Sequence, residues 1–92
     1  MTYRVTLRPA AARDLSRQRA WAQLALEGAI LSLGDDPRPR GAIKLSGSSG
    51  AWRVRVTIDG IQWRLVYEIN DPQQSVRVLR ITRRNESTYR GM

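Results

Sequence analysis

The chain has 92 residues, 41% of them hydrophobic, and a net charge of +8 from 16 basic and 8 acidic side chains. It has no cysteine and no histidine, which excludes disulfides, thiolate chemistry, histidine proton shuttles and the commonest metal ligands. No apolar run approaches the roughly 18 residues of a membrane-spanning helix, and no signal peptide is evident. We therefore expect a single cytoplasmic domain over residues 1–92, with no metal and no cofactor.

The positive charge indicates what kind of partner the domain has. An excess this large in so small a domain favours a polyanion, either nucleic acid or an acidic protein segment. All but one of the basic residues are arginine, with Lys44 as the exception. Arginine matches the geometry of a phosphate group with paired hydrogen bonds.

The N-terminal region predicts a strand followed by two helices. Residues 3–8 alternate between apolar and polar side chains, which is typical of a half-buried strand, and Pro9 ends it. Proline suits the first turn of a helix, and residues 10–15 have high helix propensity. We expect this helix to break or bend near residues 16–19 before the helical pattern continues.

The second helix is predicted over residues 19–33. Gly34, followed by an Asp-Asp-Pro run, indicates its end through a C-terminal glycine cap. Its apolar residues cover a wide arc. One stripe comprises Ala22, Leu26, Ala29, Ile30 and Leu33, and a second comprises Trp21, Leu24 and Leu31. We assign all three tryptophans, Trp21, Trp52 and Trp63, to the core.

The remaining chain predicts a loop and a hairpin. Residues 38–50 are rich in glycine, serine and proline and are expected to be a loop. Residues 52–67 form two runs of β-branched and aromatic side chains around Asp59-Gly60, which is a strong hairpin signal. A third strand of this sheet is expected over residues 75–82.

Alternation along the hairpin separates an apolar face from a basic face. In the first strand Val54, Val56 and Ile58 alternate with Arg53 and Arg55, and side chains two apart share a face. In the second strand the apolar set contains Ile61, Trp63, Leu65 and Tyr67, which places Arg64 with the other arginines. An ordinary solvated strand face is the alternative interpretation of these arginines.

The last strand is ambiguous, because Val76 and Val78 compete with Leu79 and Ile81 for the core. If Leu79 and Ile81 face the core, Arg80 and Arg84 lie on the basic face. The elements together predict an α+β fold, in which a strand precedes a helical hairpin packed on one face of a mostly antiparallel four-stranded sheet.

Six short segments resemble the RelE/ParE superfamily of toxins from type II toxin–antitoxin systems, and they span nearly the whole chain. They are Ala12-Arg13-Asp14-Leu15, Asp36-Pro37-Arg38, Lys44-Leu45, Trp52-Arg53-Val54-Arg55, Trp63-Arg64-Leu65-Val66-Tyr67, and Arg83-Arg84 together with Tyr89-Arg90. The resemblance implies the same RelE-like fold. It also implies a cognate antitoxin as partner and, for the RelE branch, ribosome-dependent cleavage of messenger RNA without a metal.

The resemblance also implies a set of site residues. The residues assigned to catalysis are Arg55, Arg64, Arg84 and Tyr89, and those assigned to RNA binding are Lys44, Arg53 and Arg83. Guanidinium groups would stabilise negative charge on the phosphoryl oxygens in the transition state. Tyr89 would stack on a base or exchange a proton, or would only pin the tail to the sheet. Either Arg83 or Arg84 would complete the basic cluster.

Two other functions remain as alternatives. The ParE branch of the superfamily inhibits DNA gyrase and cleaves nothing. The absence of histidine and the arginines at positions where relatives carry lysine are also compatible with an inactive RNA-binding module.

Overall fold

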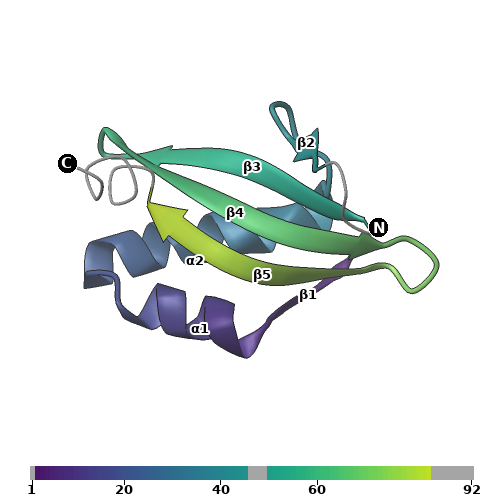
Figure 1. Cartoon of the computed structure of the whole chain (residues 1–92), viewed down its shortest axis with the longest axis horizontal. Helices are drawn as coiled ribbons and strands as arrows, with labels where there is room; N and C mark the ends of the chain where they lie inside the picture. Colours follow the sequence, from purple (N-terminus) through teal and green to yellow (C-terminus); the bar gives the residue numbers. More distant parts are fainter. Residues whose placement is uncertain (1, 46–49, 84–92) are drawn as a thin grey trace.

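The computed structural model describes residues 2–45 and 50–83, which form two helices and five strands (Figure 1). In chain order the elements are β1 (Arg4–Leu7), α1 (Pro9–Ser16), α2 (Ala20–Asp35), β2 (Ile43–Lys44), β3 (Ala51–Ile58), β4 (Ile61–Asn70) and β5 (Ser75–Arg83). The expected break between the helices is confirmed, because α1 ends at Ser16 and α2 begins at Ala20.

The strands form one sheet in the order β1-β5-β4-β3-β2, and both helices lie on the same face of it (Figure 1). The pair β1 and β5 is parallel, and the other neighbours are antiparallel. The α+β class is therefore confirmed, but the sheet has five strands in the described residues where four were expected. The additional strand is β2, in the segment expected to be a loop, where Ile43 and Lys44 pair with Arg53 and Trp52.

A tight turn at Asp59-Gly60 sets the register of the hairpin. Both residues have positive φ, 54° for Asp59 and 79° for Gly60. Two consecutive residues in this region match the two-residue hairpin turn that follows the natural twist of the strands. The turn pairs Ile58 with Ile61, and the pairing then continues without a shift to Ala51 and Glu68.

The core lies between β4 and α2. Trp63, Leu65 and Tyr67 alternate along β4 and are buried, as the sequence pattern predicted. Leu26, Ile30 and Leu33 of α2 are buried in the same cluster. The core assignment of Trp21 is wrong: its side chain is 43% exposed, and its ring meets Trp63 edge-on with centroids 6.3 Å apart.

A bulge in β5 explains the ambiguous alternation of that strand. Tyr67 pairs with Val78 and Val66 pairs with Arg80, so the register skips Leu79. An extra residue in one strand reverses the alternation beyond it. Val76 and Val78 before the bulge and Ile81 after it are therefore all buried, and the two pairs of apolar residues do not compete.

Asp14 of α1 closes the edge of β5 beyond the point where β1 ends. One of its carboxylate oxygens accepts hydrogen bonds from the backbone N–H of Ile81 at 2.9 Å and from Nε of Arg80 at 2.7 Å. Burial by itself would raise the pKa of Asp14, but these hydrogen bonds and the positive charges of Arg80 and Arg17 outweigh it and lower the pKa. A single carboxylate thus takes the place of a neighbouring strand.

Gly34 lies inside α2 and does not cap it, which corrects the expected role of this glycine. The helix continues to Asp35, with Asp36 as its C-cap. A Cβ atom at position 34 would lie 2.7 Å from the carbonyl oxygen of Tyr3. The Gly34 carbonyl accepts a hydrogen bond from the Tyr3 N–H at 2.7 Å. Glycine is therefore required here for the close approach of α2 to the start of β1.

We predict that Gly34→Ala lowers the free energy of unfolding by about 1–3 kcal/mol, because the added methyl group meets backbone that cannot move freely. Gly28→Ala is the matched control, since a methyl group added at Gly28 would have no atom within 4 Å. That substitution should raise the free energy of unfolding by up to about 1 kcal/mol through helix propensity. Urea denaturation measures both, and equal effects of the two substitutions would contradict the close-approach account.

We predict that Asp14→Asn lowers the free energy of unfolding by about 1.5–3 kcal/mol at neutral pH, because a buried acceptor of charged hydrogen bonds is lost. Since folding lowers the pKa of Asp14, its contribution is present above its usual pKa near 4 and is lost as the pH falls below that value. The difference between the variant and the native chain should therefore shrink in acid. Urea denaturation at neutral pH and at a pH below about 4 measures this difference. Asp59→Asn, at the exposed hairpin turn, is the control under both conditions.

Candidate functional site

Three arginines of the hairpin lie together on the face of the sheet opposite the helices. Arg55 of β3 pairs directly with Arg64 of β4, and Arg53 lies two residues along the same strand. Since side chains two apart in a strand share a face and cross-strand partners lie side by side, the three guanidinium groups converge. We call Arg53, Arg55 and Arg64 the arginine cluster.

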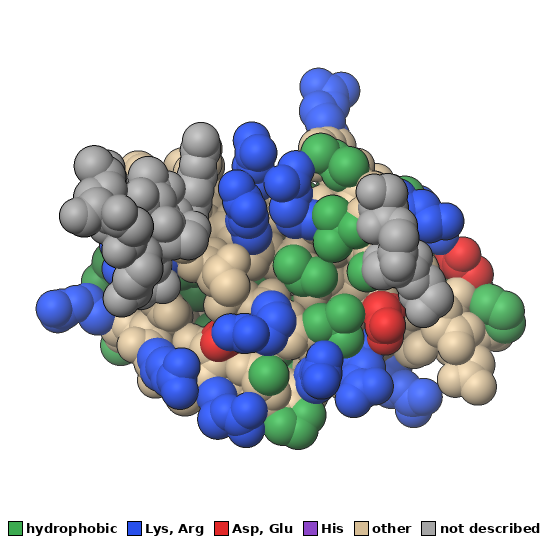
Figure 2. All heavy atoms as spheres, viewed as in Figure 1, with side chains coloured by type: hydrophobic (Ala, Val, Ile, Leu, Met, Phe, Trp, Pro, Cys, Tyr) green, Lys and Arg blue, Asp and Glu red, His purple; other side chains and the backbone are tan. Residues whose placement is uncertain are grey.

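None of these arginines has a carboxylate partner among the described residues. The ion pairs found there are Arg38 with Asp71 and Arg80 with Asp14. Nε of Arg53 and Nε of Arg64 are buried and have no hydrogen-bond partner within residues 2–45 and 50–83. Figure 2 shows Lys and Arg side chains gathered over β3 and β4, with the acidic side chains in view lying elsewhere.

Partial burial of Arg53 and Arg64 and repulsion among the three like charges characterise the arginine cluster, in which Arg55 is exposed. Burial, followed by the charges of Arg55 and Arg64, lowers the pKa of the Arg53 guanidinium from its usual value. Arginine nevertheless stays protonated at neutral pH. Like charges directly opposite one another destabilise a sheet, so the arrangement costs stability unless an anion neutralises it. A phosphate or another anion would both neutralise the charge and accept the free N–H groups.

The other side chains of this face limit what the site can do chemically. Val66 lies opposite both Arg53 and Arg80, and Thr82 lies opposite Arg64. Arg80 is half-exposed, but Asp14 engages its guanidinium. The described part of this face thus combines anion-binding donors with an apolar side chain, a hydroxyl group and the carboxylate of Glu68, which lies four residues along β4 from Arg64 and is paired with Arg77 of β5. The three arginines favour anion binding and charge stabilisation at the middle of the hairpin.

The structure places two of the remaining predicted site residues, Lys44 and Arg83, away from the arginine cluster. Arg83 pairs with Trp63 and lies 5.8 Å over its ring, on the helix-facing side of the sheet. Lys44 is exposed and pairs with Trp52, which lies on the face opposite Arg53. Arg84 and Tyr89 lie outside the described residues. The structure therefore brings Arg53, Arg55 and Arg64 together and places Arg83 and Lys44 elsewhere.

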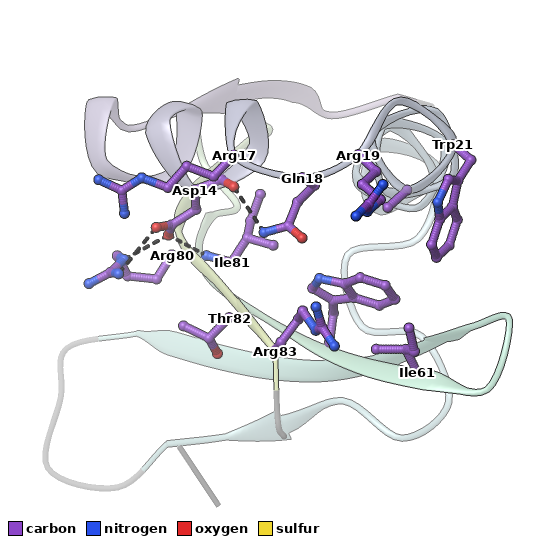
Figure 3. Close-up of a pocket in the computed structure, with 12 residues that line it drawn as sticks. Asp14, Arg17, Gln18, Arg19, Trp21, Ile61, Arg80, Ile81, Thr82 and Arg83 are labelled. Atoms are coloured by element: carbon purple, nitrogen blue, oxygen red, sulfur yellow. Dashed lines mark hydrogen bonds and ion pairs between the residues drawn. The ribbon is translucent and has the colours of Figure 1, made fainter. Parts of the chain in front are cut away.

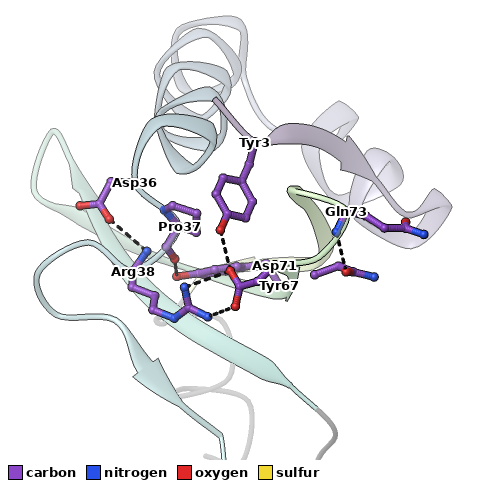
Figure 4. Close-up of polar contacts among 8 residues, drawn as sticks. Tyr3, Asp36, Pro37, Arg38, Tyr67, Asp71 and Gln73 are labelled. Atoms are coloured by element: carbon purple, nitrogen blue, oxygen red, sulfur yellow. Dashed lines mark hydrogen bonds and ion pairs between the residues drawn. The ribbon is translucent and has the colours of Figure 1, made fainter. Parts of the chain in front are cut away.

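A polar network that the sequence reasoning missed holds the connection after α2 to the turn between β4 and β5 (Figure 4). Asp71 accepts hydrogen bonds from the Tyr3 hydroxyl at 2.6 Å and from Arg38 at 2.8 Å. The hydrogen bonds from Arg38 and Tyr3 lower the pKa of Asp71. Arg38 also lies 5.2 Å over the ring of Trp52. These partners are far apart in sequence, so no local pattern could reveal them.

Beside this network, Tyr67 is held by the same connection. Its hydroxyl donates a hydrogen bond to the carbonyl oxygen of Pro37 at 2.7 Å. Burial raises the pKa of Tyr67 to about 12, so the phenol remains protonated at neutral pH. This hydrogen bond thereby holds the helix-facing side of β4 in place, and the opposite side of the same strand carries Arg64.

No helix among residues 2–45 and 50–83 combines the length and apolarity needed to cross a membrane. In the same part of the chain, no three His, Cys, Asp or Glu side chains gather where they could hold a metal ion.

We predict that Arg55→Gln raises the free energy of unfolding by roughly 0.2–1 kcal/mol at low salt, because it removes a repulsion between directly paired like charges. The gain should fall as salt screens the native cluster. Arg13→Gln is the control, since Arg13 lies in the last turn of α1 and remote from the cluster. Thermal or urea denaturation at two salt concentrations measures the effect, and destabilisation at low salt would contradict it.

Comparison with known proteins relates this fold to toxins. A chain of the RelBE2 toxin–antitoxin complex from Mycobacterium tuberculosis is 26% identical, with a TM-score of 0.79 over 91% of this chain and 93% of that chain. A mutant of the Escherichia coli toxin RelE in the free state is 19% identical, with a TM-score of 0.74 over 96% and 90% of the two chains. The archaeal RelE–RelB complex from Pyrococcus horikoshii contains a chain 24% identical, with a TM-score of 0.71 over 91% and 97%.

The sequence comparison assigns the family. A search of curated proteins found no match. Residues 5–88 match the family described as the ParE toxin of the type II toxin–antitoxin system parDE. This match covers most of the sequence, and the structural neighbours include RelE toxins. The chain therefore belongs to the ParE toxin family of type II toxin–antitoxin systems, within the RelE/ParE superfamily.

Proposed function

We propose that this toxin cleaves messenger RNA on the ribosome. The observation that carries the proposal is the arginine cluster, in which two arginines are paired directly across the sheet with no carboxylate partner among the described residues. A protein gains nothing in stability from such an arrangement. A row of phosphates supplies both the negative charge and the acceptors that the cluster needs.

The proposed reaction is attack by the RNA 2′-hydroxyl on the adjacent phosphorus. The 2′-oxygen loses its proton and forms a bond to phosphorus, the bond from phosphorus to the 5′-oxygen breaks, and that oxygen takes up a proton. Negative charge grows on the phosphoryl oxygens in the transition state. We assign Arg64 and Arg55 to this charge, because fixed guanidinium groups stabilise it without having to reorganise.

The other roles in the proposal follow from position. Arg53 is half-buried beside the other two arginines and would orient the flanking RNA backbone. We keep Arg84 and Tyr89 as proposed participants from the C-terminal tail, where a phenol beside cations could exchange the proton of the 2′-hydroxyl. The cluster supplies charge but no group that titrates near neutral pH, so by itself it would be a poor nuclease on free RNA, and the proposal also requires reactive geometry imposed from outside the toxin. Dependence on the ribosome would provide that geometry by holding the RNA in a near-attack conformation.

Inhibition of DNA gyrase is the second candidate function, and the match to the ParE toxin family favours it. In that case the arginine cluster would bind an acidic surface or DNA and would perform no chemistry. The two functions have different products, since cleavage yields shortened messages and gyrase inhibition yields relaxed or broken DNA.

We predict that Arg64→Gln lowers the rate of message cleavage on purified translating ribosomes by about 100-fold or more, because one donor to the developing oxyanion is lost. Arg55→Gln should lower it in the same direction. Arg13→Gln, which removes one charge from the helical layer, should leave the rate nearly unchanged. Primer extension on the message measures cleavage, and far-ultraviolet circular dichroism confirms that each variant is folded.

Full cleavage by both cluster variants would contradict the roles assigned to Arg55 and Arg64. Intact messages together with loss of gyrase supercoiling activity would instead establish the second candidate. A supercoiling assay on the same toxin preparations distinguishes the two.

A further inference from the structure

A second basic site lies on the helical side of the molecule, away from the arginine cluster. A pocket of about 390 Å³ opens between the α1–α2 turn and the ends of β4 and β5 (Figure 3). Its lining residues include Arg17, Gln18, Arg19, Trp21, Trp63 and Arg83. We call it the tryptophan pocket. It plays no part in the mechanism proposed above.

The tryptophan pocket carries excess positive charge. Figure 3 shows Arg19, from the start of α2, and Arg83, from the end of β5, reaching into the same space. Asp14 is the acidic side chain among the described lining residues, and Arg80 and the Ile81 N–H already occupy its oxygens. Neither Arg19 nor Arg83 has an ion-pair partner among the described residues. An incoming anion would therefore meet guanidinium groups without acidic competition.

Two further hydrogen-bond donors of the pocket have no acceptor in the part of the chain that the structure describes. Trp63 is 1% exposed, and its indole Nε1, together with Nε of Arg83, is buried without a partner in the described residues. A buried indole N–H normally finds an acceptor, so this donor remains available to one. The start of α2 has no side-chain cap and no acidic residue in its first turn. The partial positive charge at the N-terminus of α2 therefore also favours an anion in the pocket.

The turn between α1 and α2, which carries Arg17 and Arg19, is held in place before any ligand binds. The side chain of Gln18 donates a hydrogen bond to the carbonyl oxygen of Asp14 at 3.2 Å. The side chain of Gln23 donates to the carbonyl oxygens of Gln18 at 2.8 Å and Ser16 at 3.3 Å. Arg17 and Arg19 flank Gln18 in this braced turn. A preformed site binds with a smaller loss of conformational entropy.

The pocket continues into an apolar surface on α2. Leu24 is 72% exposed, Leu31 is 67% exposed, and Trp21 at the rim of the pocket is 43% exposed. Gly28 lies between the two leucines and carries no side chain to interrupt the surface. The spacing 21, 24, 28, 31 places the four residues along one face of the helix. RNA offers no aliphatic side chains to this surface, whereas an amphipathic peptide offers both an acidic group and apolar groups.

We propose that the tryptophan pocket binds an acidic side chain of the antitoxin and that apolar residues of the same antitoxin segment cover Trp21, Leu24 and Leu31. The carboxylate would accept hydrogen bonds from Arg19, Arg83 and the indole N–H of Trp63. This inference rests on the antitoxin partner of a type II toxin and is independent of whether the toxin cleaves RNA. It leaves the arginine cluster on the opposite face of the sheet outside this contact.

The test uses the 92-residue chain and its cognate antitoxin. The double variant Arg19→Gln/Arg83→Gln should bind the antitoxin at least about tenfold more weakly in isothermal titration calorimetry, because two charged hydrogen bonds are lost. Arg4→Gln/Arg40→Gln is the control, since both residues are exposed and the same amount of charge is removed. The control should retain native affinity.

A second measurement reports on the pocket itself. In a toxin labelled with nitrogen-15 at its three tryptophans, the indole N–H resonance of Trp63 should move downfield when the antitoxin binds, because that group gains an acceptor. The Trp63 resonance is assigned by its disappearance in a Trp63→Phe variant. If that variant does not fold, the Arg19→Gln variant serves instead, because a change at this exposed residue of the pocket should shift the nearby indole resonance.

Three outcomes would overturn the inference. They are equal affinities of the pocket and control variants, an unmoved Trp63 indole resonance in the complex, and a loss of RNA or ribosome binding in the pocket variant with its antitoxin affinity intact. The last result would show that the pocket binds a nucleic-acid phosphate. Failure of message cleavage in the native toxin would remove the proposed nuclease function and leave these measurements unaffected.

Discussion

Burial of one face of β4 is the constraint on which the rest of the structure depends. Trp63, Leu65 and Tyr67 fill the space beneath α2, and each is at most 1% exposed. Since side chains alternate along a strand, this burial forces Arg64 to the other face. The hairpin turn then fixes its partner as Arg55. The arginine cluster is thus a consequence of core packing, and a one-residue slip would bury its charges.

The end of β5 depends on a different interaction, the one between Asp14 and the exposed strand edge. Because β1 ends at Leu7, the last residues of β5 lack a neighbouring strand on that side, and Asp14 supplies acceptors to Ile81 and Arg80. This contact engages Arg80, and the bulge at Leu79 determines the face on which Arg83 lies. The irregular part of β5 therefore determines that Arg80 is engaged by Asp14 and that Arg83 lies at the tryptophan pocket.

The two basic sites lie on opposite faces of the sheet, so the molecule has two separate basic surfaces. The arginine cluster has polar and apolar neighbours on an open sheet face, as expected for a nucleic-acid backbone. The tryptophan pocket is concave and continues into exposed leucines of α2, as expected for a protein segment. In a toxin with two such surfaces, the antitoxin could bind the helical layer. Other parts of the antitoxin would then determine whether the arginine cluster is covered or stays accessible.

The sequence by itself determined the order of the elements, the break between the helices, the hairpin turn and the convergence of Arg53, Arg55 and Arg64. Each of these follows from local propensity or from strict alternation, which acts over a few residues. Only the tertiary structure decided the bulge at Leu79, the face of Arg83, the exposure of Trp21 and the role of Gly34. These features depend on contacts between segments distant in the chain: Asp14 with Ile81, Trp21 with Trp63 and Gly34 with Tyr3. Local patterns carry no information about such contacts, because the geometry that brings the partners together exists only in the folded chain.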